Sequence, residues 1–437
     1  MTLKKTKRTL LRQDMKALSI LLLNTYDRAS GAEKLASQTA HFLAKRGHNV
    51  RFYVKEIIDP APMAWTRRLG DGKLGLRFES KWRRITGLND LFFGGSWRLL
   101  SHPDFINADI VHAFNLHGHY FSLPSLVPIA RRKPFLWSPV DIWPITGGCA
   151  YPRGCQRYRQ GCGNCPHVKS IYPQLTRDTT RLMSWIRRNI YRMNNIHFLL
   201  HTQWLQERYR EVLGKEAWIR KLNYGVDPDE FYPIDKISAR RHFGVPDRPE
   251  VFCAGLFHSS LLDERKGLVK LMLRLGQRIH EFPRPIHFLV AGHQVEEFKA
   301  LIANHFSGDM TFTGYLMEDR LREAYGAIDV LLFPTIEENM ALTAINAMAC
   351  SVPVISSRAG GQVELITDGK DGILTPIDDI DAMIDKLFWL ADHPEICRKI
   401  GREARETVLR RFNIHHYIES LERLYVELCH GDGERKK

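Results

Sequence analysis

Two acidic residues, Glu337 and Glu338, stand between a strand-like run and a helix-like run of the sequence. The run DVLLFPT precedes them, and ALTAINAMAC follows with the spacing of a helix that packs its small residues. The amides that open such a helix, around Leu342 and Thr343, form a site for an anion such as a diphosphate. Since a carboxylate repels phosphate, Glu338 would act on the group attached to that diphosphate, such as sugar hydroxyls or a developing cation. A simple helix cap is the alternative.

Two cations, Arg265 and Lys266, stand in LDERKGLVK at the start of another expected helix. Positive side chains are unfavourable beside the N-terminal end of a helix dipole, so their position is explained if they hold an anion. A solvated surface pair is the alternative. Gly31, in DRASGAEK, would let backbone approach a phosphate or sugar, although a plain turn accounts for it more simply. The absence of Gly-x-Gly-x-x-Gly there argues against an ordinary dinucleotide enzyme.

Four cysteines, Cys149, Cys155, Cys162 and Cys165, fall within a run of 17 residues. The last two have the Cys-x-x-Cys spacing of a zinc knuckle, whereas the first pair is spaced more loosely. In a reducing cytosol such a cluster favours a metal, so we expect a structural zinc here; two disulfides or four free thiols are the alternatives. The acidic pair Asp227–Asp229 is interpreted as a turn, and no metal is expected to take part in catalysis.

Strand-like and helix-like runs alternate along the whole chain. The expected strands are 17–24, 48–54, 108–114, 133–139 and 196–202, then 251–257, 286–292, 310–315, 330–335 and 352–357. This alternation predicts an α/β protein with two Rossmann-like, doubly wound domains that face each other across a ligand-binding cleft. The predicted parts are a basic tail (1–16), a first domain (17–218), a second domain (219–410), and a final helix (411–437) that could cross back to the first domain. Residues 60–102 are expected to form an insertion or a helical excursion.

The composition adds a charge asymmetry between the two halves. The chain has 437 residues, of which 44% are hydrophobic, and no run reaches the ~20 apolar residues of a membrane span. The early run ALSILLL is therefore interpreted as a buried strand, and the protein is expected to be cytoplasmic. The first 200 residues carry 32 Lys and Arg against 12 Asp and Glu, whereas the rest carry 31 against 37. This basic half would attract an anionic membrane surface or a phospholipid-linked substrate, and no nucleic-acid-binding motif accompanies it.

Several long motifs together resemble the retaining glycosyltransferases of family 4, which have the GT-B fold. They are FPTIEENMALTAINAMACSVPVISSRAGGQVELITDGKDGIL, YGVDPDEFYP and ERKG. The stretch DIWPITGGCAYPRGCQRYRQGCGNCP is further similar to a bacterial exopolysaccharide subgroup of the colanic-acid type. The resemblance implies transfer of a sugar from a nucleotide-sugar donor to a glycan acceptor, lipid-linked, in exopolysaccharide or cell-surface polysaccharide synthesis. A degenerate, non-catalytic relative that serves as a partner or scaffold is the alternative.

The resemblance also implies roles for individual residues. It assigns catalysis to Glu338 and Asp141. The residues expected to bind the donor are Gly31, Arg265, Lys266, Leu342, Thr343 and Asn346. The resemblance also places the glycine pair Gly360–Gly361 near the donor, and Glu364 matches the Glu that follows this pair. Two positions depart from the family pattern. Asn346 replaces a Glu that grips the ribose and lacks its charge-assisted strength, and Val140 replaces the His that precedes Asp141 in the family.

Overall fold

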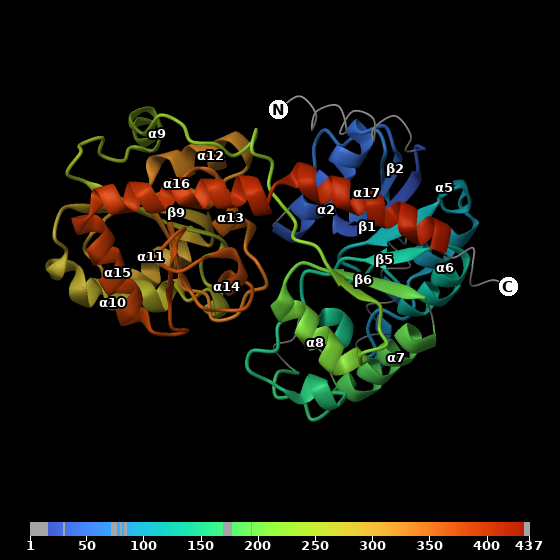
Figure 1. The fold of residues 1–437 in the computed structure, drawn as a ribbon. Helices are drawn as coiled ribbons and strands as arrows, with labels where there is room; N and C mark the ends of the chain where they lie inside the picture. The colour runs from blue at the N-terminus through green and yellow to red at the C-terminus, as the bar shows by residue number, and fades with distance from the viewer. Residues whose placement is uncertain are drawn as a thin grey trace.

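The computed structural model describes residues 16–28, 31–70, 77–78, 81–82, 85–168, 177–193 and 195–431. The basic tail expected at 1–16 lies outside them except for Lys16, and so do parts of the segment 60–102. The described chain forms two parallel sheets, each covered by helices, which stand side by side (Figure 1). The expected α/β architecture of two doubly wound domains is confirmed.

The first domain contains a seven-stranded parallel sheet with the order β3-β2-β1-β4-β5-β6-β7. Its strands are β1 (Ser19–Tyr26), β2 (Asn49–Glu56), β3 (Thr66–Arg68), β4 (Ile110–Ala113), β5 (Phe135–Trp137), β6 (Ile196–Leu200) and β7 (Ile219–Lys221). Its helices are α2 (Gly31–Lys45), α4 (Gly94–Arg98), α5 (Pro103–Ile106), α6 (Leu126–Arg132), α7 (Thr180–Met193) and α8 (Gln203–Leu213). The run Ile20–Leu23 is buried at every position, because helices cover both faces of a parallel sheet.

Two features of this sheet differ from the expectation. Residues 60–102 contribute the edge strand β3, which pairs with β2 through Phe52 and Thr66, so this segment is more than a helical excursion. The sheet also continues beyond 196–202, since β7 pairs with β6, and the first domain therefore extends past the predicted boundary at 218. Both strands are only three residues long, which is too short to give a periodic signal in the sequence.

The second domain contains a six-stranded parallel sheet with the order β10-β9-β8-β11-β12-β13. Its strands are β8 (Phe252–Ser260), β9 (Ile286–His293), β10 (Asp309–Gly314), β11 (Val330–Phe333), β12 (Val354–Ser357) and β13 (Ile373–Thr375). Its helices are α9 (Lys236–Phe243), α10 (Leu268–Arg278), α11 (Val295–Ile302), α12 (Glu318–Ala327), α13 (Leu342–Ala349), α14 (Gln362–Leu365), α15 (Ile380–Asp392) and α16 (Pro394–Arg411). Short 3₁₀ helices complete the described chain: η1 (Leu99–Ser101), η2 (Leu123–Ser125), η3 (Trp143–Ile145), η4 (Arg157–Gln160), η5 (Glu264–Lys266) and η6 (Ile279–Glu281).

The last helix, α17 (Ile414–Gly431), packs on the first domain rather than the second (Figure 1). Glu422 accepts hydrogen bonds from Arg46, at 2.5 Å, and His48, at 3.0 Å, and the Tyr425 hydroxyl lies 2.6 Å from a ring nitrogen of buried His112. Where the chain crosses between the domains, Val226 pairs with the backbone beside Asn413. No helix of the described residues is long and apolar enough to cross a membrane.

Candidate active site

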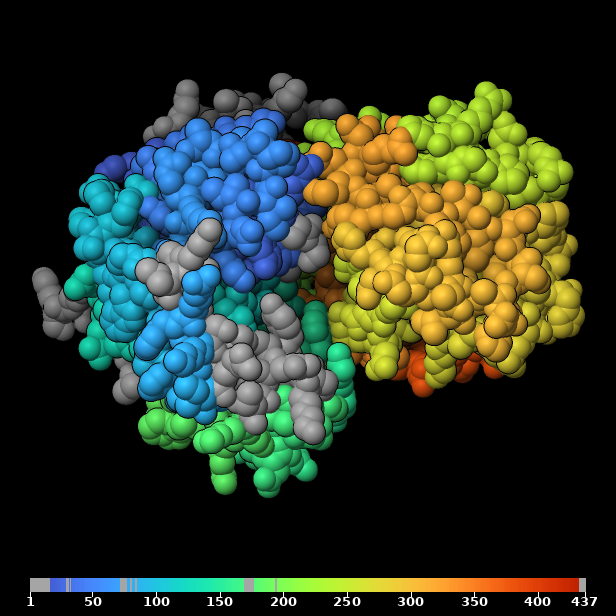
Figure 2. All heavy atoms as spheres, turned by 180° about the vertical axis from the view of Figure 1, so that it is seen from behind, coloured from blue at the N-terminus to red at the C-terminus, as the bar shows by residue number. Residues whose placement is uncertain are grey.

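A cleft of about 870 Å³ lies between the two domains, and Figure 2 shows from behind the furrow along which the two lobes meet. Its first-domain wall comprises His117, Gly118, Trp143, Cys149, Ala150, Tyr151, Arg153 and His167. Its second-domain wall comprises Ser260, Leu262, Asp263, Glu264, Arg265 and Gln294. The cleft therefore collects loops that follow parallel strands, which is where open parallel sheets bind ligands.

Glu338 forms the centre of a charged cluster at this wall of the second domain. Its side chain is buried, with Oε2 accepting hydrogen bonds from Lys266 Nζ and, at 3.2 Å, from Arg265 Nη1. Burial raises the pKa of Glu338, but the charges of Lys266 and Arg265 outweigh it, so its pKa lies below the ordinary value of 4.5. The structure thus brings together three residues that the sequence analysis singled out 72 or 73 positions apart.

The turn before α10 brings the two cations to the cluster. Asp263 begins the turn, since its carboxylate accepts a hydrogen bond from the Arg265 amide at 3.0 Å and from the Arg265 guanidinium at 3.1 Å. Gly267 ends it with a φ of +69°, and a Cβ there would lie 2.3 Å from the carbonyl oxygen of Pro334. Only glycine permits both that φ and this approach to the end of β11. Lys266 is therefore held directly against the strand that leads to Glu338.

The paired glycines Gly360 and Gly361 pack on the backbone of the acidic loop. A Cβ on Gly360 would lie 1.6 Å from the carbonyl oxygen of Glu338, and one on Gly361 would lie 1.8 Å from that of Asn339. The Gly361 amide donates to the Glu338 carbonyl at 3.1 Å. The expected glycine loop therefore contacts the candidate catalytic residue through its main chain and fixes the backbone from which the Glu338 carboxylate projects.

Helix α13 begins at Leu342, directly after the acidic loop. The preceding residue, Ala341, has no side-chain oxygen with which to cap the helix, so the amides of its first turn stay suited to an external anion. Gly31 lies across the cleft from this point, and a Cβ there would be 3.6 Å from the Leu342 side chain. Gly31, Leu342 and Thr343, which were singled out separately, therefore belong to one region between the domains.

The first-domain wall carries an acid–imidazole pair that the sequence analysis only half identified. Asp141 is buried; one of its carboxylate oxygens lies 3.1 Å from Nε2 of His117, and the other accepts the Trp143 amide at 2.8 Å. Burial lowers the pKa of His117, but Asp141 outweighs that effect and the pKa lies above its ordinary value of 6.5. His117 was missed, although NLHGHY directly follows the strand expected at 108–114. Val140 instead packs against the hydrophobic core.

Two further residues that the resemblance singled out have different surroundings. Asn346 is buried in α13 beside the Tyr325 side chain, and among the described residues its Oδ1 has no hydrogen-bond partner. Glu364 joins the two domains: it forms an ion pair with Lys221 and accepts the Trp204 amide at 3.0 Å at the start of α8. In this structure Glu364 therefore acts as a contact between domains.

The cysteine loop (residues 146–168) lies on the first-domain side of the cleft. Cys149, Cys155, Cys162 and Cys165 are half-buried free thiols that line one small cavity of about 20 Å³, together with His167. Within the described part of the chain, no three of these sulfur atoms lie within 4.8 Å of one another. Asp227, Asp229 and His415 do meet that criterion, but Asp227 accepts the Asp229 amide at 2.9 Å, as in the turn that was expected.

Comparison with known proteins identifies the domain that carries the charged cluster. Residues 249–393 match the family model described as Glycosyl transferases group 1. The second domain is therefore similar to the domain that this family model describes. This match contains Arg265, Lys266, Glu338 and the start of α13, and it leaves the first domain uncovered.

Two relatives illustrate the range of proteins to which the chain is similar. The chain is 24% identical over 227 residues to N-acetyl-alpha-D-glucosaminyl L-malate synthase of Bacillus anthracis, covering 52% of this chain and 58% of that protein. It is 25% identical over 271 residues to WcaC of Escherichia coli (strain K12), provisionally described as a colanic acid biosynthesis glycosyl transferase, covering 59% and 62%. The chain spans about half the length of the curated relatives it matches.

A solved structure extends the likeness to both domains. The Anabaena protein Alr3699/HepE, determined in complex with UDP-glucose, superposes with a TM-score of 0.68 at 16% identity, covering 93% of this chain and 99% of that one. At this identity the likeness concerns the fold alone. The expected GT-B architecture, two Rossmann-like domains facing across a cleft, is thereby confirmed.

Proposed function

We propose that this protein is a retaining glycosyltransferase that moves a hexosyl group from a nucleotide-sugar donor to a lipid-linked glycan acceptor in cell-surface or exopolysaccharide synthesis. The observation that carries the proposal is the buried cluster of Glu338, Lys266 and Arg265 at the cleft, within the residues that match the group 1 family model. Alr3699/HepE, which has a similar fold, is described in complex with UDP-glucose, and this supports a nucleotide-sugar donor.

The charged cluster suggests how donor binding would begin. Glu338 pairs with the two cations that would face a diphosphate. A donor diphosphate that binds Lys266, Arg265 and the first amides of α13 would replace this ion pairing and release the Glu338 carboxylate toward the sugar. There the negative charge of Glu338 would stabilise the positive charge that develops on the sugar as the diphosphate departs. The same cations would stabilise the leaving group.

The opposite wall would contribute through His117 and Asp141. Asp141 orients the imidazole, and the positive charge that it favours on His117 would attract the donor or the acceptor from the first-domain side. Val140 cannot hydrogen-bond a sugar, so we assign to His117 the polar contact that this position lacks. No metal is assigned to catalysis, because the two cations and the helix start already supply positive charge to the diphosphate.

The acceptor proposal rests on the exposed face of the first domain. Helix α7 exposes Trp185, with 63% of its surface accessible, and Leu182, with 45%, and it carries exposed Arg181. The Thr179 side chain, just before α7, bonds the Gly87 carbonyl at 2.6 Å, so this face adjoins the segment that exposes Ile85 and Phe92. In Figure 2 these two segments, light blue and green, meet on the lower part of the lobe.

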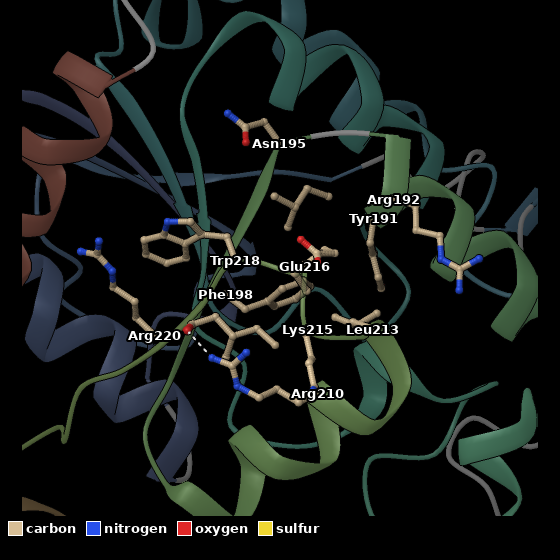
Figure 3. A pocket seen from close by; sticks show the side chains of 13 residues that line it. Tyr191, Arg192, Asn195, Phe198, Arg210, Leu213, Lys215, Glu216, Trp218 and Arg220 are labelled. Carbon is tan, nitrogen blue, oxygen red and sulfur yellow. Dashed lines mark hydrogen bonds between the residues drawn. The ribbon is translucent and has the colours of Figure 1, made fainter. Parts of the chain in front are cut away.

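Basic residues adjoin the same helix. A hollow of about 550 Å³ at the last turn of α7 is lined by Trp218 and by four basic residues, Arg192, Arg210, Lys215 and Arg220 (Figure 3). Exposed Trp and Leu beside clustered Arg and Lys are the composition of surfaces that bind anionic bilayers. We therefore place this face of the protein against the inner surface of a membrane that holds the lipid-linked acceptor.

A screen of nucleotide sugars tests the enzymatic proposal directly. The full chain is incubated with UDP-, GDP- and dTDP-linked hexoses and with membrane lipid extract, and release of nucleoside diphosphate is measured. Release that depends on Glu338, with product retaining the anomeric configuration by NMR, supports the proposal. Tight donor binding with no turnover under any condition would instead favour the non-catalytic partner or scaffold.

A further inference from the structure

The cysteine loop forms a bridge between α7 and the donor wall of the second domain. On its own side, Arg187 of α7 donates to the carbonyls of Trp143 and Thr146, at 2.8 and 2.6 Å. Across the cleft, the ring of Tyr151 lies 4.0 Å from the guanidinium carbon of Arg265. The Arg153 amide donates to the Glu337 carboxylate at 3.0 Å. One loop of the first domain thus touches both the donor cation and the acidic pair of the second.

This loop has little apolar material with which to hold that shape. Of its aromatic side chains, Tyr158 is buried, whereas Tyr151 faces the cleft. Arg153, Cys162 and Asn164 have positive φ angles, which cost free energy for residues other than glycine and persist only where the surroundings impose them. Something other than hydrophobic packing must therefore stabilise the loop.

The four cysteines supply the means. They line one small, partly open cavity of about 20 Å³, which exceeds the roughly 10–15 Å³ that a single water-sized occupant needs. Two of the sulfurs already accept main-chain hydrogen bonds, Cys162 from the Gly147 amide at 3.2 Å and Cys165 from the His167 amide. Four sulfur ligands with a Cys-x-x-Cys pair fit tetrahedral zinc.

We propose that Cys149, Cys155, Cys162 and Cys165 bind one Zn²⁺, and that this zinc fixes the cysteine loop as a clamp on the donor site. With Zn–S bonds of about 2.3 Å, the sulfurs must approach one another to about 3.8 Å, so the thiol side chains contract around the metal when it binds. All four positions are then filled by sulfur, so the metal activates no water. Its effect on the donor passes through Tyr151 and Arg153.

The zinc itself is tested on the full chain purified without a metal-affinity tag. Elemental analysis and native mass spectrometry of the unmodified protein are expected to find one zinc per chain. Cys162→Ser should lose it, whereas Cys429→Ser, a half-buried cysteine of α17 outside the loop, should keep it. Absence of metal from the unmodified protein, with four titratable thiols or two disulfides in the loop, would overturn the proposal whether or not the Cys162 variant folds.

The clamp is tested by hydrogen–deuterium exchange before and after a chelator removes the zinc. Loss of protection is expected at the Arg153 amide and in peptides that cover Glu337 and Arg265. Tyr151→Leu should cause the second loss while keeping its zinc, and Tyr232→Leu, which removes a tyrosine beside Arg322 elsewhere, should not. If hydrogen–deuterium exchange of the peptides that cover Glu337 and Arg265 is unchanged when the zinc is removed, the proposed clamp is refuted. The link to the donor rests on the proposed function, but both measurements use no sugar and would succeed or fail independently of transfer.

Discussion

The two walls of the cleft are built in different ways. The second-domain wall is compact: a glycine-ended turn packs on the end of a strand and brings Lys266 and Arg265 into direct contact with Glu338. The first-domain wall is assembled from longer loops, in which His117 depends on Asp141 and Tyr151 on the cysteine loop. Under the proposed function this wall would bind a diphosphate, a common chemical group, so one compact site could serve many donors. An acceptor varies between proteins, and loops on a sheet edge can vary with it.

The largest expected effect is on catalysis and tests the second-domain wall. Glu338→Gln should lower the rate of sugar transfer by about 100-fold or more, because removing one preorganised electrostatic group from an active site costs that much. Affinity for the nucleoside diphosphate should persist, since Lys266 and Arg265 remain. Steady-state kinetics and calorimetry measure the two effects. Glu296→Gln, an exposed carboxylate of the same domain, is the matched control. A Glu338 variant with the wild-type rate would refute the assignment.

The second prediction concerns donor binding at the same wall. Lys266→Ala removes a charged hydrogen bond, worth roughly 1.5–3 kcal/mol, so affinity for the nucleoside diphosphate should fall about tenfold or more. The variant also frees Glu338 from its closest partner, which should raise the pKa of that carboxyl. Lys299→Ala, which removes an ion pair with exposed Glu296 and a cation–π contact with Phe312 away from the cleft, should bind normally. Equal affinity of both variants in calorimetry would exclude Lys266 from the site.

The third prediction tests whether the outer face of the first domain, unlike the second domain, binds a membrane. Trp185→Ser should weaken binding to phosphatidylcholine vesicles that contain phosphatidylglycerol by about fivefold, because a large apolar side chain no longer enters the interface. Trp389→Ser, a partly exposed tryptophan of the second domain, should bind like the wild type. Co-sedimentation measures both. If the wild type binds vesicles equally well with and without phosphatidylglycerol, the proposed membrane face is contradicted.

The smallest expected effect concerns His117 and is a matter of pH. Because Asp141 raises the pKa of His117 above 6.5, this pair contributes stability that is fully present below pH 6.5 and is lost as the pH rises through the raised pKa. The melting temperature of the wild type should therefore exceed that of His117→Gln most below pH 6.5, with the difference shrinking toward alkaline pH. His280→Gln provides the control at an exposed histidine. A pH-independent difference would contradict a raised pKa of His117 in the folded state.

What the sequence could predict depended on whether a residue stands in a motif with a local signature. The donor wall was accessible because its motifs are contiguous and their glycines, helix start and acidic pair each have a local signature. The shared cavity of the four cysteines follows from their close spacing. His117 was missed because its role depends on a contact with Asp141 that only the folded structure shows. The contact of Glu364 with Lys221 and Trp204 joins two domains and has no local signal at all. The roles assigned to these residues stay predictions until they are tested.

The crossing of α17 back to the first domain has a mechanical consequence. The chain passes between the domains twice, near Val226 and near Asn413, and these two passages are bonded to each other: the Val226 amide donates to the Phe412 carbonyl at 2.9 Å and the Ile414 amide to the Val226 carbonyl at 3.1 Å. Gly225 packs so closely that a Cβ would lie 2.4 Å from the Asn413 carbonyl carbon. Bodies joined by two strands fastened together can swing about that line but cannot slide or twist freely. Opening and closing would then be described by a single angle, and every residue pair across the cleft would separate in fixed proportion to its distance from the hinge.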